Sequence, residues 1–342
     1  MPAPFDRPPD AVALAPASLA NLGPGFDTLG LAIAGLDDRI DAWRTDDDGV
    51  VTVVASGEGA AWTSPPADRN TAAIGAKAVL LHSGQGGGLA LRVTKAVTPG
   101  SGLGSSAASA VGGAVAAAAA LGLDLSTGED AIDGDSDGRA ALIEAVLEGE
   151  AAASGAWHGD NALPSLFGGL VLVSSTDPTR YRRIALGGDL HLAVILPQVQ
   201  VLTKAARAML PSSVGLKDAV SNATHLAFLL DALRDGDAAE AGRCLMQDRL
   251  VEPVRATLVP CYEPVRRAAL DAGAHGVALS GSGPAMFALC RSALHAGRTA
   301  EAMREASEGH GISALAFATS PCLDGARVVT AAEADVAMEA AR

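Results

Sequence analysis

Features that would assign a chain to a membrane or to an export route are missing from this sequence. No apolar run reaches the ~18 residues that a membrane span requires, and the longest, residues 114–123, is mostly alanine. The first ten residues carry prolines and acids instead of the basic patch and apolar segment of a secretory signal. We therefore expect a cytoplasmic protein that makes no membrane contact.

Paired cysteines and a basic stripe are lacking as well. The four cysteines have neither the spacing of a zinc site nor the density of a disulfide scaffold, which favours buried, reduced thiols at Cys244, Cys261, Cys290 and Cys322. A formal net charge of -14 would repel a nucleic-acid backbone. No nucleic-acid partner is expected.

The 342 residues exceed what one hydrophobic core usually organises, which favours two domains around a cleft. Residue patterns predict strands at 11–15, 50–55, 89–97, 170–174, 190–196, 276–279 and 285–290, and helices at 105–121, 139–153, 204–210, 216–234, 238–247 and 262–272. These elements do not alternate as in a parallel sheet, so the predicted fold class is α+β. We place the domains at residues 11–178 and 179–336.

A glycine-rich and serine-rich loop, PGSGLGSSA at residues 99–107, lies between a predicted strand and an alanine-rich helix. Backbone amides and the helix N-terminus would converge there, which attracts anions, and Ser105 and Ser106 offer hydroxyls to phosphate or Mg²⁺. The lysine of a Walker A loop is missing. A flexible turn is the alternative; we interpret the loop as an ATP-binding site formed by Pro99, Gly100, Ser101, Gly102, Leu103, Gly104, Ser105, Ser106 and Ala107.

A carboxylate near the loop is needed if Mg²⁺ accompanies the nucleotide, because Mg²⁺ prefers oxygen ligands. Glu148 and Glu150 are the candidates, at the end of a predicted helix that runs into the polar segment SGAWHGDN at residues 154–161. An ordinary structural role is the alternative for a single member of that segment such as His158. The whole cluster is too polar for a plain connector.

Three segments, taken in order, resemble the GHMP small-molecule kinases. PASLANLGPGFD at residues 16–27 is similar to the PAS-x-x-N-x-x-x-GFD opening of that family, the loop at 99–107 to its P-x-x-x-GLGSSAA, and SGSGP at 280–284 to its SG-x-GP turn. Within the superfamily, the HGDN segment ending at Asn161 resembles the homoserine kinase signature. The resemblance implies an N-terminal nucleotide-binding domain and a C-terminal ferredoxin-like α/β sandwich domain.

The same resemblance implies a reaction and a substrate site. ATP would phosphorylate the side-chain hydroxyl of L-homoserine to O-phospho-L-homoserine, a step of threonine biosynthesis. By matched position, Asn21 and Asp27 would hold the amino end of the substrate. Arg207 and Arg255 would hold its carboxylate, which a guanidinium binds through two parallel hydrogen bonds.

The remaining roles follow from matched positions too. Asn70 would lie near the adenine, and Glu150 matches the metal-associated glutamate of the family better than Glu148 does. Glu150 and Ser106 would therefore hold Mg²⁺. The residues implied in catalysis are His158, Asp160, Asn161 and Thr203.

The proton acceptor is open at this stage. Several sister kinases have an aspartate where this chain has Asn161, and an amide cannot act as a general base. In a loose phosphoryl-transfer transition state the hydroxyl proton can leave late, to a phosphate oxygen. Asp160, or a water held by His158, is the competing acceptor.

Other interpretations remain beside this one. The spacing from Asp133 to Glu144 formally matches an EF-hand calcium loop, but the residues before it make a poor helix, so a solvated acidic insertion is the favoured interpretation. The protein could also be a GHMP kinase for another small alcohol, or a sensor that binds ligands without turnover. A homodimer is a further expectation.

Overall fold

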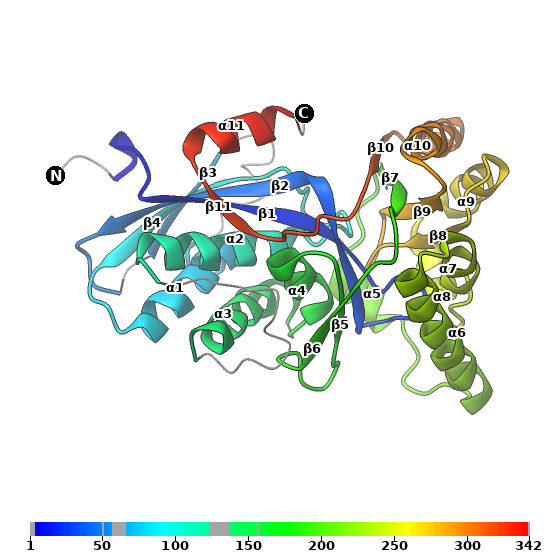
Figure 1. The fold of residues 1–342 in the computed structure, drawn as a ribbon, viewed down its shortest axis with the longest axis horizontal. Helices are drawn as coiled ribbons and strands as arrows, with labels where there is room; N and C mark the ends of the chain where they lie inside the picture. Colours follow the sequence, from blue (N-terminus) through cyan, green and yellow to red (C-terminus); the bar gives the residue numbers. More distant parts are fainter. Residues whose placement is uncertain (1–3, 50, 57–65, 124–136, 156, 341–342) are drawn as a thin grey trace.

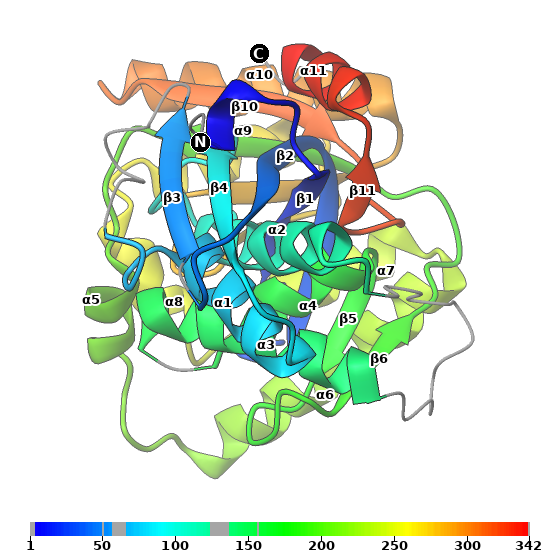
Figure 2. The same cartoon turned by 90° about the vertical axis from the view of Figure 1, so that its left-hand side faces the viewer.

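The computed structural model describes residues 4–49, 51–56, 66–123, 137–155 and 157–340. Its strands form a seven-stranded sheet and a four-stranded sheet, placed side by side in Figure 1. In the seven-stranded sheet the order is β11-β1-β2-β4-β3, and β5 and β6 extend it from β2; the bounds are β1 Ala11–Ala20, β2 Leu29–Thr45, β3 Val51–Ser56, β4 Gly88–Thr94, β5 Leu170–Val173, β6 Tyr181–Ile184 and β11 Arg327–Val329. Figure 2 shows β3, β4, β2, β1 and β11 next to one another in this order.

Helices cover both faces of the seven-stranded sheet (Figure 1). One face carries α1 Thr71–Ser83, α2 Ser105–Ala120, α3 Asp137–Ser154 and α4 Gly159–Phe167, and the other carries α11 Ala331–Ala340. The alternation along β1 explains this, because Ala13 and Ala15 join the main core whereas Val12 and Leu14 pack with Ala334 of α11.

Small residues bring α2 unusually close to its neighbours. A Cβ on Gly112 would lie 2.2 Å from the Ile40 side chain of β2, and a Cβ on Gly113 would lie 2.2 Å from the Ala72 carbonyl of α1. No larger side chain fits there. The alanine-rich composition therefore places the helix that follows the glycine loop tightly against the sheet.

The four-stranded sheet has the order β10-β7-β9-β8 with antiparallel pairing throughout, which is the ferredoxin-like arrangement. Its strands are β7 His191–Pro197, β8 Gly276–Leu279, β9 Met286–Cys290 and β10 Ala314–Thr319, and its helices are α5 Thr203–Ala208, α6 Leu216–Asp235, α7 Ala238–Leu245, α8 Glu252–Arg255, α9 Tyr262–Asp271 and α10 Ala293–Gly309. Leu192 and Val194 face the core shared with the first sheet, and Ala193 and Ile195 face a second core. Short 3₁₀ turns lie at Pro4–Asp6 and Ala256–Leu258.

The α+β class is confirmed, with several elements that the residue patterns did not predict. The longest strand, β2, was not predicted, nor were α1, α10, β10, β11 and α11. The strand predicted at 89–97 ends at Thr94, since residues 95–97 already turn toward the loop. Strands β6 and β11 lie beyond residue 178 yet belong to the first sheet, so the division into 11–178 and 179–336 stays a prediction.

None of the helices in the described part of the chain is long and apolar enough to cross a membrane. All four cysteines are free thiols, and three of them are buried.

Candidate active site

The phosphate loop ends at an uncapped helix N-terminus. Gly104, the N-cap of α2, has φ 70° and has no side chain, so it supplies no capping oxygen to the first amides of this 16-residue helix. An anion placed there would meet those amides and the positive end of the helix dipole. The local structure thus fits the predicted phosphate site.

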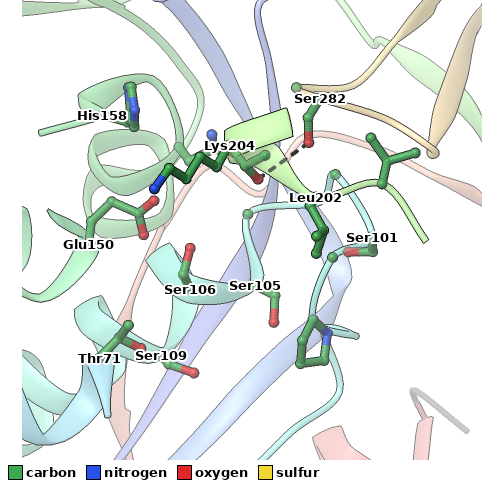
Figure 3. A pocket seen from close by; sticks show the side chains of 18 of the residues that line it. Thr71, Ser101, Ser105, Ser106, Ser109, Glu150, His158, Leu202, Lys204 and Ser282 are labelled. Carbon is green, nitrogen blue, oxygen red and sulfur yellow. Dashed lines mark hydrogen bonds between the residues drawn. The ribbon is translucent and has the colours of Figure 1, made fainter. Parts of the chain in front are cut away.

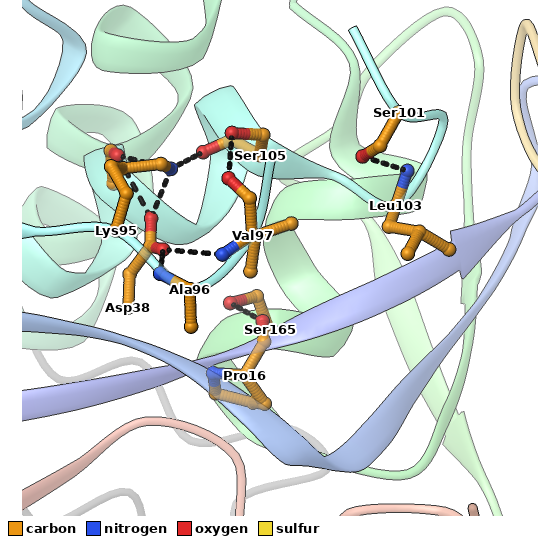
Figure 4. A network of polar contacts seen from close by, with 10 residues as sticks. Pro16, Asp38, Lys95, Ala96, Val97, Ser101, Leu103, Ser105 and Ser165 are labelled. Atoms are coloured by element: carbon orange, nitrogen blue, oxygen red, sulfur yellow. Dashed lines mark hydrogen bonds and ion pairs between the residues drawn. The ribbon is translucent and has the colours of Figure 1, made fainter. Parts of the chain in front are cut away.

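A buried ion pair between Lys95 and Asp38, which was not predicted from the sequence, supports the loop where it joins α2 (Figure 4). The Lys95 ammonium pairs with Asp38 and donates to the Ser105 carbonyl at 2.8 Å and to the Ser109 hydroxyl at 2.9 Å. Asp38 also accepts from the backbone amides of residues 96 and 97, each at 3.1 Å. Burial lowers the pKa of Lys95, and the charge of Asp38 opposes that shift.

The turn at residues 280–284 holds the loop from the other side. The Ser280 hydroxyl donates to the Gly102 carbonyl at 2.6 Å, and the Ala285 amide donates to the Ser101 carbonyl at 3.0 Å. A Cβ on Gly102 would lie 2.6 Å from the Ser280 carbonyl oxygen, so only glycine allows this approach. Two motifs far apart in the sequence therefore form one rigid unit.

One cavity of about 490 Å³ lies between the loop and the second sheet. Figure 3 shows side chains from α1, α2, α3 and α5 around it. All the predicted site residues line it except two; those that line it are Asn21, Asp27, Asn70, Pro99, Gly100, Ser101, Gly102, Gly104, Ser105, Ser106, Glu150, His158, Asp160, Asn161, Thr203, Arg207 and Arg255. Leu103 and Ala107 are buried in the main hydrophobic core instead.

The serines of the loop differ in what they can offer a ligand. Ser105 donates its hydroxyl proton to the Val97 carbonyl at 2.7 Å, whereas the Ser106 hydroxyl hydrogen-bonds Glu150. Burial raises the pKa of Glu150 to about 8, and Ser106 counteracts part of that rise. A buried carboxyl beside a hydroxyl is a suitable pair of oxygen ligands for a divalent cation, which would favour the charged form.

These two side chains would not form a complete metal site alone. Among the described residues, no three His, Cys, Asp or Glu side chains are grouped so as to hold a metal ion. Mg²⁺ in nucleotide sites usually takes one or two carboxylates and completes its coordination with substrate phosphates and water. The donors present fit a metal that arrives with its nucleotide.

On the opposite wall, two arginines flank the ring of Phe26. The guanidinium carbons of Arg207 and Arg255 lie 5.3 Å and 5.0 Å from the ring centroid. Both Nε atoms are buried and have no hydrogen-bond partner among the residues that the structure describes. Arg255 uses one terminal nitrogen to donate to the Gly281 carbonyl at 2.9 Å.

Asp27 and Arg207, which the sequence assigns to opposite ends of the substrate, bond each other here. The guanidinium donates to both carboxylate oxygens of Asp27, at 3.0 and 2.7 Å. A third contact, from Arg207 to Nδ1 of His158 at 3.4 Å, requires a neutral ring nitrogen as acceptor. Burial and the neighbouring Arg207 lower the pKa of His158, which agrees with that state.

The turn that carries Asp27 has a strained backbone. Asn21, Leu22 and Asp27 have φ of 73°, 46° and 56°, a region that non-glycine residues rarely occupy. The Asn21 amide stabilises the turn, because it donates to the Gly281 carbonyl at 3.0 Å and accepts from the Asp27 amide at 3.2 Å. Asn70 has a comparable local contact, accepting from the Ala73 amide as the N-cap of α1.

The first turn of α4 brings the three polar residues of the HGDN segment to the cavity. His158 is the N-cap and Asp160 is buried beside it. Burial, followed by the charge of Asp27, raises the pKa of Asp160 to about 7. Asn161 accepts a hydrogen bond from Ser18 at 3.1 Å.

The cavity contains polar residues that were not predicted. One is Ser282, whose hydroxyl lies 3.5 Å from the hydroxyl of the predicted residue Thr203. The other unpredicted polar lining residues are Arg69, Thr71, Lys95, Ser109 and Lys204. Of these, only Lys95 had a usable signal in the sequence, as a lone lysine between a hydrophobic strand and the loop. The proposed calcium loop from Asp133 lies outside the described residues up to position 136.

The comparisons with known proteins agree with this site. A family described as GHMP kinases N terminal domain matches residues 70–169, and one described as GHMP kinases C terminal matches residues 229–309. The chain is 43% identical to the homoserine kinase of Pyrococcus furiosus over 305 residues, covering 89% of this chain and 96% of that one. It is 38% identical to the homoserine kinase of Aeropyrum pernix over 298 residues, covering 86% and 91%.

Solved structures extend the likeness to the fold. The crystal structure of homoserine kinase from Cytophaga hutchinsonii superposes with a TM-score of 0.84 at 34% identity, covering 93% of this chain and 97% of that chain. The mevalonate kinase of L. major shares the fold at a TM-score of 0.63 and 18% identity, covering 89% and 94%. The chain belongs to the GHMP kinase family, in its homoserine kinase group.

Proposed function

We propose that this kinase transfers the terminal phosphoryl group of ATP to the side-chain hydroxyl of L-homoserine within the 490 Å³ cavity. The observation that carries the proposal is the pairing, across one cavity, of an uncapped helix N-terminus with two arginines whose buried Nε–H groups have no partner in the described chain. The first suits phosphate and the second suits a carboxylate. Homoserine has a carboxylate, an ammonium group and a primary alcohol.

The nucleotide half of the proposal rests on the loop. Its backbone and the first amides of α2 would bind the ATP phosphates, and Asn70, at the start of α1, would lie near the adenine. Glu150 and Ser106 would hold Mg²⁺. When bound, Mg²⁺ neutralises charge on the phosphates. Glu150 would then lose the proton that burial otherwise retains.

The amino acid half rests on Phe26 and its flanking arginines. Phe26 fixes the directions of the Arg207 and Arg255 guanidinium groups, so that a carboxylate can accept from both. Asp27 supplies the anion for the substrate ammonium, and the strained backbone of its turn directs it toward the cavity. Substrate binding therefore redistributes the hydrogen bonds that Asp27 and Arg207 now make to each other.

In the transfer itself, the homoserine hydroxyl oxygen forms a bond to the terminal phosphorus while the bond from that phosphorus to the bridging oxygen breaks. ADP leaves with the electron pair, and the hydroxyl proton passes to a base. Asp160 suits this role, because a carboxyl with a pKa of about 7 can accept a proton near neutral pH. Positioning and charge neutralisation supply the rest.

An ADP-release assay with homoserine, mevalonate, shikimate and galactose tests the substrate. We expect Mg-ATP and homoserine to release ADP well above the ATP-only background. Mevalonate and shikimate carry a carboxylate but no ammonium group, and galactose carries neither. The panel therefore distinguishes recognition of the carboxylate by the arginines from recognition of the ammonium group by Asp27. ADP release with a different alcohol but not with homoserine would contradict the proposal.

A further inference from the structure

Ser18 lies behind the cavity, at the point where three segments meet. It is fully buried in β1, and its hydroxyl donates to Oδ1 of Asn161 at 3.1 Å. Its amide donates to the carbonyl of Leu103 in the phosphate loop at 3.1 Å. Ser18 is not among the residues that line the cavity, whereas Asn161 is.

The packing around this hydrogen bond leaves no room for another arrangement on the loop side. A Cβ on Gly104 would lie 2.3 Å from the Ser18 hydroxyl oxygen and 2.9 Å from Oδ1 of Asn161. Glycine at position 104 therefore lets the loop backbone lie next to the hydrogen-bonded pair, where any side chain would clash with both partners.

The direction of the hydrogen bond from Ser18 determines whether the Asn161 amide presents its Nδ2 hydrogens or its oxygen to a ligand. Because its oxygen accepts from Ser18 and lies on the Gly104 side, the planar amide must present its Nδ2 hydrogens away from both residues. Asn161 also lines the cavity. Without a donor at position 18, the amide could rotate and present its oxygen, whose partial negative charge would oppose a phosphate. The amide is useful in one of its two orientations only.

We propose that Ser18 is a positioning residue for phosphoryl transfer: its hydroxyl holds the Asn161 oxygen on the side of Ser18 and Gly104, so that the Nδ2 hydrogens on the other side of the amide are left to donate to the phosphoryl group in the cavity. The inference rests on the proposed function. In the transition state, charge spreads over the equatorial oxygens of the transferred group, and a fixed donor stabilises that charge. This donor role also explains why position 161 has an amide where sister kinases have an aspartate.

Ser18→Ala removes the hydroxyl and tests the role. We expect kcat to fall by roughly 10-fold, less than the ~100-fold expected for Asn161→Ala, because the amide remains but loses its orientation. The KM values for ATP and homoserine should stay within about two-fold. In the Asn161→Ala background, Ser18→Ala should leave kcat unchanged.

Ser165→Ala is the matched control. Ser165 is fully buried on α4, the helix that carries Asn161, and its hydroxyl donates to the Pro16 carbonyl of β1 at 2.7 Å (Figure 4). Ser165→Ala loses a hydrogen bond of the same kind, which is made to Pro16 and not to the Asn161 side chain. Its kcat should match that of the unmodified enzyme even if its melting temperature falls as much as that of Ser18→Ala.

A second measurement is independent of turnover. The chain has only four asparagines, Asn21, Asn70, Asn161 and Asn222, so ¹⁵N-asparagine labelling gives few side-chain amide signals. Ser18→Ala should shift the Asn161 pair, assigned by its loss in Asn161→Ala, and Ser165→Ala should leave that pair in place. Unshifted Asn161 signals, or an equal loss of kcat from Ser18→Ala in both backgrounds, would overturn the role of Ser18. Inactivity of the unmodified enzyme would count against the proposed function alone.

Discussion

Several side chains that the sequence assigns to ligand binding already hydrogen-bond other protein groups in this cavity. Two of the four predicted substrate anchors, Asp27 and Arg207, hydrogen-bond each other, and the hydroxyls of Ser105 and Ser106 already have protein partners. Arg255 differs, since it is buried, donates to the backbone carbonyl of Gly281, and has an Nε–H without a partner among the described residues. The substrate carboxylate should therefore depend most on Arg255.

Arg255→Ala should raise the KM for homoserine by roughly 100-fold and change the KM for ATP by less than about three-fold, since a charge-assisted hydrogen bond to a buried carboxylate contributes about 1.5–3 kcal/mol. Initial rates at varied concentrations of each substrate measure this. Arg267→Ala, which removes an exposed arginine paired with Asp271, is the control. Equal increases in both KM values would remove Arg255 from the substrate site.

Asp160 separates the two routes for the proton. If it accepts the proton, kcat/KM should fall as pH drops below about 7, because protonation then removes the base. Asp160→Asn should lower kcat by about 10² to 10⁴-fold and abolish that acidic limb. A pH–rate profile that Asp160→Asn leaves unchanged in shape and height would favour direct transfer to a phosphate oxygen.

At the scale of elements, the motifs could be predicted from the sequence because the residues of each motif are contiguous. The loop at 99–107, the turn at 280–284 and the HGDN segment all meet at the cavity, as their chemistry suggested. The supports of the motifs could not be found that way. Lys95 and Asp38 are 57 positions apart and Ser18 and Asn161 are 143 apart, so only the folded sheet brings them together.

The fold shows the same division. Helix α2 could be predicted from its alanines, but β2 could not, because its LDDRID stretch reads as a polar loop and pairs only after a register shift near Pro16 of β1. Strand β11 is three residues long and gains its identity from pairing with β1, more than 300 positions away in the chain. Local patterns carry no information about such pairings.

Substitutions of two loop glycines test whether the contact between the loop and the 280–284 turn contributes to ATP binding and to stability. Gly100 and Gly102 both have positive φ, 73° and 81°, but a Cβ would meet nothing within 4 Å at Gly100 and two backbone oxygens within 2.8 Å at Gly102. Gly102→Ala should therefore raise the KM for ATP and lower the melting temperature more than Gly100→Ala does. Similar losses in both variants would mean that backbone strain alone matters.

At the scale of the whole molecule, the two sheets share one hydrophobic core. The cavity is lined by the phosphate loop of the first sheet and by residues of the second sheet and its helices. The chain therefore needs both sheets in place to act, since the phosphate loop belongs to the first and Arg255 to the helices of the second. The homodimer and the cytoplasmic location expected from the sequence stay predictions.

Buried carboxyls make the stability of the molecule depend on pH. Burial raises the pKa of Glu252 from 4.5 to about 7, although the Tyr262 hydroxyl donates to it at 2.6 Å. Between these values the folded chain retains a proton that the unfolded chain releases, so the free energy of unfolding should fall as pH rises, by up to about 1.4 kcal/mol per pH unit. Glu252→Gln should reduce that slope in urea titrations at about pH 5, 6 and 7. The same slope in Glu252→Gln and in the exposed control Glu263→Gln would contradict this assignment.

The central claim is that one cavity joins a phosphate loop to an amino acid site, so that phosphate is transferred to homoserine and not to water. Phosphorus NMR of a reaction of the purified chain with Mg-ATP and L-homoserine tests it most directly. We expect a new phosphate monoester signal that grows in a 1:1 ratio with ADP and disappears when homoserine is omitted. ADP accompanied only by inorganic phosphate, or no ADP at all, would contradict the account.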